Sequence, residues 1–452
     1  MLKLLALALL ALLFIFACSA SSEETAETPP DMTPPTWSRN AVIYEVNVRQ
    51  FTTSGTFAAF SEHLPRLREL GVDILWFMPI HPIGELNRKG TLGSYYSVRD
   101  YRAVNPEFGS MDEWKALVNQ AHALGFKVII DWVANHTAWD NHLTTDHPDW
   151  YSRDEHGNFV PPVPDWSDVI DLNYDNQDMR AWMIESLKFW IQETDIDGYR
   201  CDVAGMVPLD FWEDAARELL PMKSVFLLAE HEASEYHSAF HATYGWELFH
   251  KSVDVAQGTR QVSDLFNYFA QNAARYPAEA YRMYFTSNHD ENTWNGTEFE
   301  RFQNAARPFA VMAFTAPGFP LVYNGQEAGF NRRLLFFDKD SIDWVANDFA
   351  DFYQKLIDLK HRHPALRNGA QGAPITQIVT TGSPSAFCYK REQDNARIVV
   401  LINPIQTGIN FALNDATLAG QYREVLSGDT VNLTGAETFT LPSGTAKVFE
   451  KI

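Results

Sequence analysis

The segment VIIDWVANH, residues 128–136, runs from apolar into polar residues, as a buried β-strand does where it ends. Three later segments have a similar pattern and each ends in an acidic residue: IDGYRCD (196–202), VFLLAE (225–230) and MYFTSNHD (283–290). Stretches with helical patterning lie between them, which favours a parallel βα barrel. Because such a barrel brings the carboxyl ends of its strands to one face, we expect Asp202, Glu230 and Asp290 to meet in one pocket.

The rest of the chain continues this alternation. Further strands are predicted at 41–48, 73–79, 243–249 and 319–323. Helices are predicted at 58–70, 111–124, 177–194, 210–220, 260–274, 301–315 and 349–362. We therefore expect an α/β fold in which a (β/α)8 TIM barrel occupies residues 37–369. A stretch rich in Trp, His, Asp and Pro interrupts the barrel after its third strand, and it predicts a small inserted subdomain at 137–172.

Short β-like segments separated by Gly, Asn and Pro follow the barrel. They predict a C-terminal β-sandwich over residues 370–452. The aromatic residues of the inserted subdomain either line a carbohydrate cleft or form a local core. They are Trp139, Trp150, Tyr151 and Trp166.

The N-terminus indicates export. Residues 4–17, LLALALLALLFIFA, form an apolar stretch that is short for a membrane span and typical of a signal peptide, predicted at 1–17. The adjoining IFAC (15–18) resembles the lipobox of bacterial lipoproteins, so we expect Cys18 to carry a lipid. Polar, Pro-rich residues 18–36 predict a flexible tether. Two locations stay open: an envelope lipoprotein at the outer membrane or periplasmic face, held to the membrane only by its lipid, or a secreted protein.

Charge and cysteine content narrow the classes of partner. The formal net charge is -22 and is spread along the chain, so the surface repels phosphate backbones and nucleic acid is not an expected partner. Besides Cys18 the chain holds only Cys201 and Cys388. A disulfide framework is therefore not expected, and the stability of the protein must come from its core.

The acidic residues at the predicted strand ends suit cleavage of a glycosidic bond. Arg200 and Asp202 lie two residues apart on a strand and face the same side, so we expect Arg200 to lower the pKa of Asp202. An ionised Asp202 can attack an anomeric carbon, while Glu230 donates a proton to the departing oxygen and later activates water. Asp290 can stabilise charge on the ring carbon, and His289 can bond sugar hydroxyls. Each carboxylate alone fits a structural role, but three at ordered strand ends favour catalysis.

Seven motifs resemble the short sequence regions of the α-amylase family of glycoside hydrolases. Four match the main regions in family order: DWVANH (131–136), GYRCDVA (198–204), LLAEHE (227–232) and FTSNHDEN (285–292). Three more are similar to further regions: GSYYSVRDY (93–101), DLN (171–173) and YNGQE (323–327). The likeness covers roughly residues 40–365. It implies a retaining enzyme that cleaves α-glucosidic bonds in starch or maltooligosaccharides through a covalent glycosyl-enzyme intermediate.

The resemblance also implies a role for each matching residue. Asp202 is the nucleophile, Glu230 the acid/base and Asp290 the stabiliser of the transition state. The residues that hold the sugar are Tyr96, His136, Arg200 and His289.

Calcium is the one cofactor that the resemblance implies. Asn135 matches the calcium-binding asparagine of the family. Gly205 and Met206 depart from the pattern, since relatives often carry Lys and His at these positions, where the His backbone oxygen also binds the calcium. The departure also affects the leaving-group side of the cleft.

Two alternatives stay open beside α-glucan hydrolysis. In a transglycosylase on the same fold, a sugar hydroxyl rather than water attacks the ester, and the same three carboxylates serve both reactions. A non-catalytic glycan-binding lipoprotein is the second alternative, although it would be expected to have lost one of these carboxylates.

Overall fold

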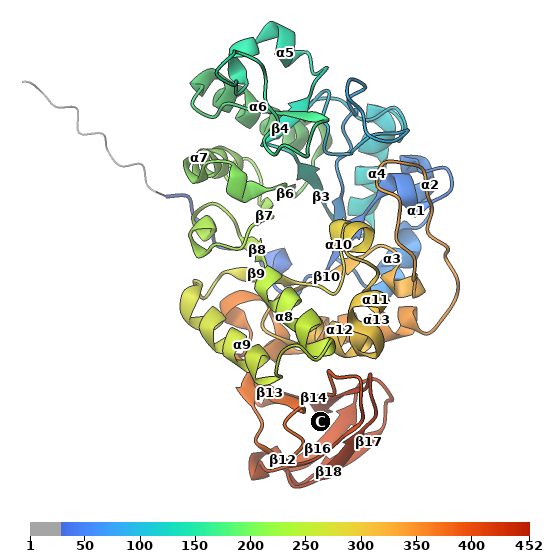
Figure 1. The fold of residues 1–452 in the computed structure, drawn as a ribbon. Helices are drawn as coiled ribbons and strands as arrows, with labels where there is room; N and C mark the ends of the chain where they lie inside the picture. Colours follow the sequence, from blue (N-terminus) through green and yellow to red (C-terminus); the bar gives the residue numbers. More distant parts are fainter. Residues whose placement is uncertain (1–28) are drawn as a thin grey trace, which may run out of the picture.

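A closed barrel of eight parallel strands forms the centre of the protein (Figure 1). The computed structural model describes residues 29–452, so the predicted signal peptide (1–17) and Cys18 lie outside the described residues. Neighbouring strands follow chain order, and the last pairs with the first. They are β1 (Ile43–Val46), β2 (Ile74–Phe77), β3 (Lys127–Trp132), β6 (Gly198–Cys201), β7 (Phe226–Ala229), β8 (Ala242–Tyr244), β9 (Tyr281–Tyr284) and β10 (Phe319–Tyr323). The predicted TIM barrel is confirmed.

Helices connect the strands, and most of them lie along the outside of the barrel (Figure 1). They are α1 (Val48–Phe51), α2 (Phe57–Ser61), α3 (Leu64–Leu70), α4 (Met111–Ala123), α6 (Gln177–Thr194), α7 (Leu209–Leu219), α8 (Trp246–Ala256), α9 (Ser263–Arg275), α10 (His289–Trp294), α11 (Glu298–Phe302), α12 (Ala306–Thr315) and α13 (Phe349–Arg362). The helices predicted at 177–194 and 349–362 have these bounds in the structure.

The sixth barrel strand differs from its prediction at 243–249. Strand β8 ends at Tyr244, and α8 begins at Trp246. The buried side chains of α8 recur at helical spacing, because Leu248 and Phe249 share a face with Ser252 and Val255. The apolar run in WELF therefore belongs to a helix, and the prediction of a strand there was wrong.

Two predicted helices are each divided in the structure. The helix predicted at 58–70 is α2 followed by α3, and Pro65 occupies the first turn of α3, where a proline is tolerated. The helix predicted at 301–315 breaks at Gln303, which has a left-handed φ of 52°. In both cases a local backbone constraint interrupts a stretch whose apolar periodicity continues.

The inserted region is a small unit beside the carboxyl end of β3. It holds a two-stranded sheet of β4 (His136–Ala138) and β5 (Val169–Asp171) and a short helix α5 (Leu143–Asp146). Of its aromatic residues, Trp150 and Tyr151 are buried in the main core, and Trp139 packs against that core. Trp166 instead lines the cavity described below.

Two antiparallel sheets form the C-terminal β-sandwich, as predicted. The larger holds β11 (Thr376–Gln377), β13 (Phe387–Gln393), β14 (Ala396–Ile402), β16 (Gly420–Glu424), β17 (Thr430–Leu433) and β19 (Ala446–Lys451). The smaller holds β12 (Thr380–Gly382), β15 (Ile409–Leu413) and β18 (Thr438–Leu441). Alternate residues of β14 face opposite ways: Val400 joins the core of the barrel, while Val399 and Leu401 join the core between the sheets. The sandwich is therefore packed against the barrel.

The structure describes residues 29–36 of the predicted tether, most of which are exposed or partly buried. Pro34 and Pro35 are buried, and the indole N–H of Trp37 donates to the backbone oxygen of Ser224 at 3.3 Å. Met32 and Trp37 are partly buried and pack against the main core, so the chain contacts the barrel just before its first strand. Within residues 29–452, no helix is both long and apolar enough to span a bilayer.

Candidate active site

The carboxyl ends of the barrel strands surround a cavity of about 560 Å³. Five of the residues predicted from the sequence line it: Tyr96, His136, Asp202, Glu230 and Asp290. The other two predicted residues, Arg200 and His289, are buried and contact members of this group. The remaining lining residues are Lys89, Ser94, Asp165, Trp166, Asp168, Val169, Val203, Trp294, Phe336 and Phe337. The fold thus brings all seven predicted residues together.

Arg200 is the centre of the charge network in this cavity. It lies on β6 and its side chain is fully buried. Its Nη1 lies 2.7 Å from Asp131 Oδ1 and 3.1 Å from Asp202 Oδ1. Its Nη2 lies 2.9 Å from Glu230 Oε1. A single guanidinium therefore holds three carboxylates from three neighbouring strands, and it places Asp202 and Glu230 within reach of the same sugar.

The backbone of Val203, directly after Asp202, adopts a conformation that directs its N–H toward Glu230. Val203 has φ 35° and ψ 46°, a left-handed conformation that a β-branched residue rarely adopts. In this conformation its N–H donates to Glu230 Oε2 at 2.7 Å. Such strain costs about 1–3 kcal/mol and persists only where the surrounding structure enforces it. Glu230 is therefore held from two sides, by Arg200 and by the backbone of Val203.

Asp290 and His289 lie in the first turn of α10, just beyond β9 rather than on it. His289 Nε2 lies 3.3 Å from Asp290 Oδ2, and His289 Nδ1 lies 2.5 Å from Glu45 Oε1. The hydroxyl of Tyr96 lies 2.7 Å from His289 Nε2 and donates to Asp131 Oδ2 at 3.1 Å. His289 thus contacts both residues: it is hydrogen-bonded to Tyr96 and forms an ion pair with Asp290.

Burial controls the protonation of the carboxylates around Arg200. Burial and the negative charge of Glu230 raise the pKa of Asp202 well above its usual range, although Arg200 acts in the opposite direction. Burial also raises the pKa of Asp131 to about 6. The expectation that Arg200 keeps the pKa of Asp202 low is therefore wrong for the ligand-free site. The physical reason is that burial and the nearby charge of Glu230 outweigh the attraction of Arg200, whose single positive charge is shared among three carboxylates.

The two histidines of the site differ in charge. Burial lowers the pKa of His136 to about 3, so its ring is neutral. Burial also lowers the pKa of His289, but the charges of Asp290 and Glu45 outweigh it and raise this pKa to about 9. At neutral pH His289 is therefore an imidazolium with two N–H donors.

Asn135, the calcium ligand that the resemblance implies, is held by neighbours within the protein. Its amide nitrogen lies 3.2 Å from His136 Nδ1, and its backbone oxygen accepts a hydrogen bond from Leu172 at 3.1 Å. Calcium takes about six to eight oxygen ligands, several of them carboxylates. In the described part of the chain, no three acidic, histidine or cysteine side chains converge where they could hold a metal ion. Asn135 instead joins the end of β3 to the inserted region.

Gly205, where relatives often carry a lysine, has a steric explanation. A Cβ at this position would lie 2.3 Å from His231 Nδ1, well inside van der Waals contact. His231 follows Glu230 directly, so its ring occupies the space beside the acid that a longer side chain at position 205 would need.

Three functional residues of the site were missed from the sequence. Glu45 and Asp131 are fully buried acids within apolar strands, and this position was itself a signal, since such residues are rarely buried without a partner. Trp294 is half-exposed, and its indole N–H donates to Asp290 Oδ1 at 3.3 Å. Trp294 lies four residues after Asp290. This spacing places the two side chains on one face of a helix, but the sequence did not predict that a helix begins at His289.

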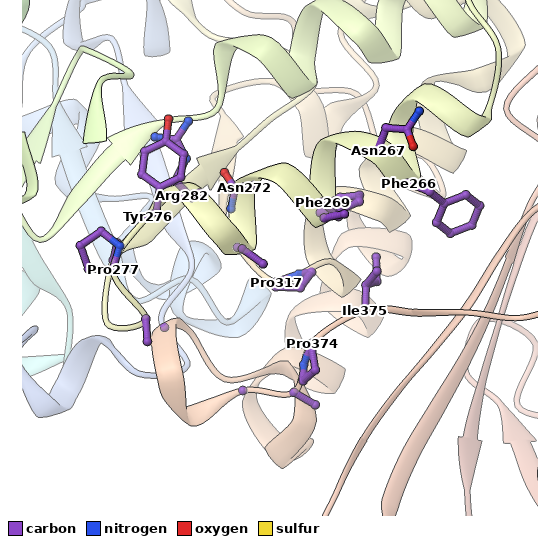
Figure 2. Close-up of a pocket in the computed structure, with 18 of the residues that line it drawn as sticks. Phe266, Asn267, Phe269, Asn272, Tyr276, Pro277, Arg282, Pro317, Pro374 and Ile375 are labelled. Atoms are coloured by element: carbon purple, nitrogen blue, oxygen red, sulfur yellow. The ribbon is translucent and has the colours of Figure 1, made fainter. Parts of the chain in front are cut away.

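A second hollow, of about 580 Å³, lies between α9 and the segment that leads into the β-sandwich (Figure 2). Its lining includes Phe269, Tyr276, Pro317 and Ile375 but no aspartate or glutamate. Although its volume is slightly larger, it lacks the acids that glycosidic cleavage requires. The cavity at the strand ends is therefore the candidate active site.

Sequence comparison gives similarity to one enzyme family. The family described as "Alpha amylase, catalytic domain" matches residues 26–164 and 150–246. The α-amylase MalA of Haloarcula japonica is 28% identical over 417 residues, an alignment that covers 86% of this chain and 60% of that protein.

Solved structures with the same fold cover nearly the whole chain. An α-amylase from Lactobacillus plantarum is 33% identical, with a TM-score of 0.83, and the alignment covers 92% of this chain and all of that one. The maltogenic α-amylase AmyB from Thermotoga neapolitana is 28% identical, also with a TM-score of 0.83, over 91% of this chain and 99% of that one.

Proposed function

Since the chain belongs to the α-amylase family and is an enzyme of that type, we propose that it hydrolyses α-glucosidic bonds in starch or maltooligosaccharides with retention of configuration. One observation carries this proposal: Arg200 holds Asp202 and Glu230 on the same guanidinium, in a cavity that Asp290 also lines. The names of its relatives, an α-amylase and a maltogenic α-amylase, support the class of substrate.

In the first step Asp202 attacks the anomeric carbon while the bond from that carbon to the glycosidic oxygen breaks. Glu230 transfers its proton to the departing oxygen, so the rest of the glucan leaves as an alcohol. The product of this step is a glycosyl ester of Asp202. Asp290 lies beside the same ring and stabilises the positive charge that develops on it in the transition state.

In the second step water attacks the anomeric carbon from the face that the leaving group vacated. The Glu230 carboxylate takes up a proton from the water, and the ester bond to Asp202 breaks. Both carboxyl groups return to their starting states. Two successive inversions give a product with the original α-configuration.

The non-reacting residues position the sugar. Tyr96 presents an aromatic ring to the cavity and bonds His289 through its hydroxyl. His289 is protonated and His136 is neutral, so they offer different hydrogen-bonding patterns to sugar hydroxyls. Arg200 keeps Asp202 and Glu230 in place while their charges change.

The substitution Asp202→Asn tests the nucleophile. It is expected to lower turnover of maltoheptaose by about four orders of magnitude, as removal of one member of a catalytic unit does. Asp210→Asn, at an exposed aspartate of α7, is the matched control and should keep full activity. An Asp202→Asn variant that keeps wild-type turnover would show that another group is the nucleophile. Proton NMR of the first product should show the α-anomer, and a β-anomer would contradict retention.

Transglycosylation on the same residues is separated from hydrolysis by product size. With excess maltotriose, a hydrolase gives only products shorter than the substrate. Products longer than maltotriose would mean that a sugar hydroxyl competes with water for the ester.

We also propose that the protein acts outside the cytoplasm, as a lipoprotein of the cell envelope anchored at Cys18 or in secreted form. The support is the N-terminal sequence alone. Mass spectrometry of the mature N-terminus tests it. A diacylglyceryl group on Cys18 that is lost in Cys18→Ser supports the anchor, and an unprocessed N-terminus in the cytosolic fraction overturns the proposal.

A further inference from the structure

We propose that a fixed wall closes the end of the active-site cavity that receives the non-reducing end of the glucan. The enzyme then removes short units from chain ends and does not cut within long chains. This inference rests on the proposed function and specifies the substrate class of that site.

Two loops that lie far apart in the sequence form this wall. We call them the β2 loop, residues 84–93, and the β10 loop, residues 329–341. They approach closely at Gly90, which has φ 62°, where an added Cβ would lie 2.4 Å from the Cβ of Phe337. The loops are therefore in direct contact, with no space for a sugar chain to pass between them there.

Hydrogen bonds join the two loops beside this contact. The backbone N–H of Leu92 donates to the backbone oxygen of Phe337 at 2.9 Å. The backbone N–H and the hydroxyl of Thr91 both donate to Asp338 Oδ1, at 2.9 and 2.6 Å. The carboxylate thus accepts two hydrogen bonds from one residue, which fixes the position of one loop against the other.

Each end of the wall is joined to a neighbouring part of the protein. On one side Lys89 Nζ lies 3.0 Å from Asp168 Oδ1, which joins the β2 loop to the inserted region. On the other side the ring of Trp294 lies 5.3 Å from that of Phe336 and 5.8 Å from that of Phe337, which joins the β10 loop to α10. All five of these residues line the cavity. The wall is therefore continuous from the inserted region to the helix that carries Asp290.

A buried arginine beneath the wall makes it rigid. Arg49 has no exposed surface, and its guanidinium donates to the backbone oxygens of Gly93 in the β2 loop and Phe336 in the β10 loop, at 3.0 and 3.5 Å. Its charge is balanced by Glu107, 2.9 Å away, and it stacks on Tyr95 at 4.2 Å. Because the same buried charge binds both loops, opening the wall would leave it unsatisfied, at a high cost. The wall is therefore a fixed part of the barrel and not a mobile lid.

The catalytic geometry shows which end of the substrate meets the wall. Glu230 protonates the departing oxygen, so the leaving, reducing-end part of the glucan lies on the side of Glu230 and Val203. The glucosyl unit under attack lies against Tyr96 and Asp290. The ring of Phe336 in the wall is stacked near that of Tyr96, with centroids 6.1 Å apart and planes within 11°. The wall thus lies on the non-reducing side of the glucosyl unit.

The size of the cavity limits what fits between the wall and the scissile bond. A cavity of about 560 Å³ lies within the range of small-ligand sites, about 300–1,000 Å³, which suits a short oligosaccharide. Met206, which follows Val203 on the leaving-group side, is 44% exposed and does not line the cavity. We therefore infer that one or two glucosyl units enter ahead of the cleaved bond, and that free chain ends or short maltooligosaccharides are the substrates.

The test compares two aryl maltoheptaosides, one free and one blocked at O4 and O6 of its non-reducing glucose. An enzyme that cleaves inside the chain treats both alike, whereas a closed wall rejects the blocked end. We expect kcat/KM for the free substrate to exceed that for the blocked one by more than about tenfold. A ratio below about tenfold, with cleavage of both, overturns the wall but leaves the proposed function intact. Failure to cleave either substrate, or maltotriose, overturns both.

The double variant Lys89→Ala, Phe337→Ala assigns this selectivity to the wall. It is expected to lower the ratio at least about fivefold toward one, because the blocked end gains space. Phe439→Ala, at a half-buried phenylalanine of the β-sandwich, is the matched control and should keep the wild-type ratio. Circular dichroism melting shows that each variant is folded. If the double variant is folded and its ratio is unchanged, the assignment of the selectivity to these residues is overturned. If the variant does not fold, the ratio of the wild-type enzyme still tests the wall.

Discussion

Replacing Arg200 by methionine should make the free energy of unfolding fall as the pH rises, because the buried carboxylates lose their positive partner. Arg200 is the positive partner of Asp131, Asp202 and Glu230, at 2.7, 3.1 and 2.9 Å. Removing one partner of a buried ion pair costs about 3–5 kcal/mol. The carboxylates can reduce this cost by keeping a proton, and the probability that they do so falls as the pH rises.

The magnitude follows from the pKa of Asp131, which burial already raises to about 6 in the wild type. Without the guanidinium this pKa rises further, so the folded variant holds a proton that the unfolded chain has released. The free energy of unfolding then falls with rising pH by about 1.4 kcal/mol per unit for each such proton. Between about pH 6.5 and 8, where Asp131 of the wild type is largely ionised, the deficit of Arg200→Met should grow by about 2 kcal/mol.

Urea unfolding followed by tryptophan fluorescence measures this deficit at several pH values. Arg391→Met is the matched control: Arg391 is equally buried but donates only to backbone oxygens, those of Ala373, Thr315 and Ala316. Burial lowers the pKa of Arg391 to about 9, so it stays charged over this range. Its loss should cost stability by the same amount at each pH. If the deficit of Arg200→Met is equally independent of pH, the reasoning is refuted. Such a result would mean that no buried carboxylate binds a proton when the guanidinium is removed.

Three further predictions follow from the same contacts. Because the ionised form of Asp202 is the nucleophile and burial raises its pKa, kcat/KM should be lost on acidification at a pH well above the usual range of an aspartate. An acid limb near pH 4, about the ordinary pKa of an aspartate, would contradict this. Val203→Gly removes a β-branched side chain from a left-handed conformation and should raise the free energy of unfolding, measured in urea, by up to about 1 kcal/mol. The strain released should exceed the cost of the added entropy of the unfolded chain. A loss of stability would show that Val203 is not strained. Dialysis against EDTA should leave the melting temperature unchanged, because the surroundings of Asn135 do not form a calcium cage; a fall that added calcium reverses would show that backbone oxygens hold the ion.

Local pattern was enough to predict most of the barrel. The strand and helix over 196–201 and 177–194 follow from apolar runs and helical spacing that neighbouring residues alone define. The prediction failed at α8, because a short segment such as WELF, with three apolar residues of four, suits a strand and a helix equally until its neighbours in space are known. Strand order then led to the three acids, since a parallel barrel leaves its carboxyl ends on one face whatever the loops do.

The charge state of the site could not be predicted in the same way. The spacing of Arg200 and Asp202 indicated a pair and a lowered pKa. The structure adds Asp131 and Glu230 to the same guanidinium, and the direction of the shift reverses. The pKa of a buried group depends on every charge and solvent molecule around it in space, and sequence neighbours are a small part of those.

The sequence by itself therefore determined the barrel, the order of its strands and the identity of the acids at their ends, because these depend on periodicity and on a topology with few alternatives. Only the tertiary structure decided how the cavity is bounded. Thr91 and Asp338 are separated by 247 positions, and nothing in the local sequence of either indicates the other. Their contact exists because closing the barrel brings β10 beside β1, which is also the neighbour of β2, so that loops from distant parts of the chain meet over the same pocket.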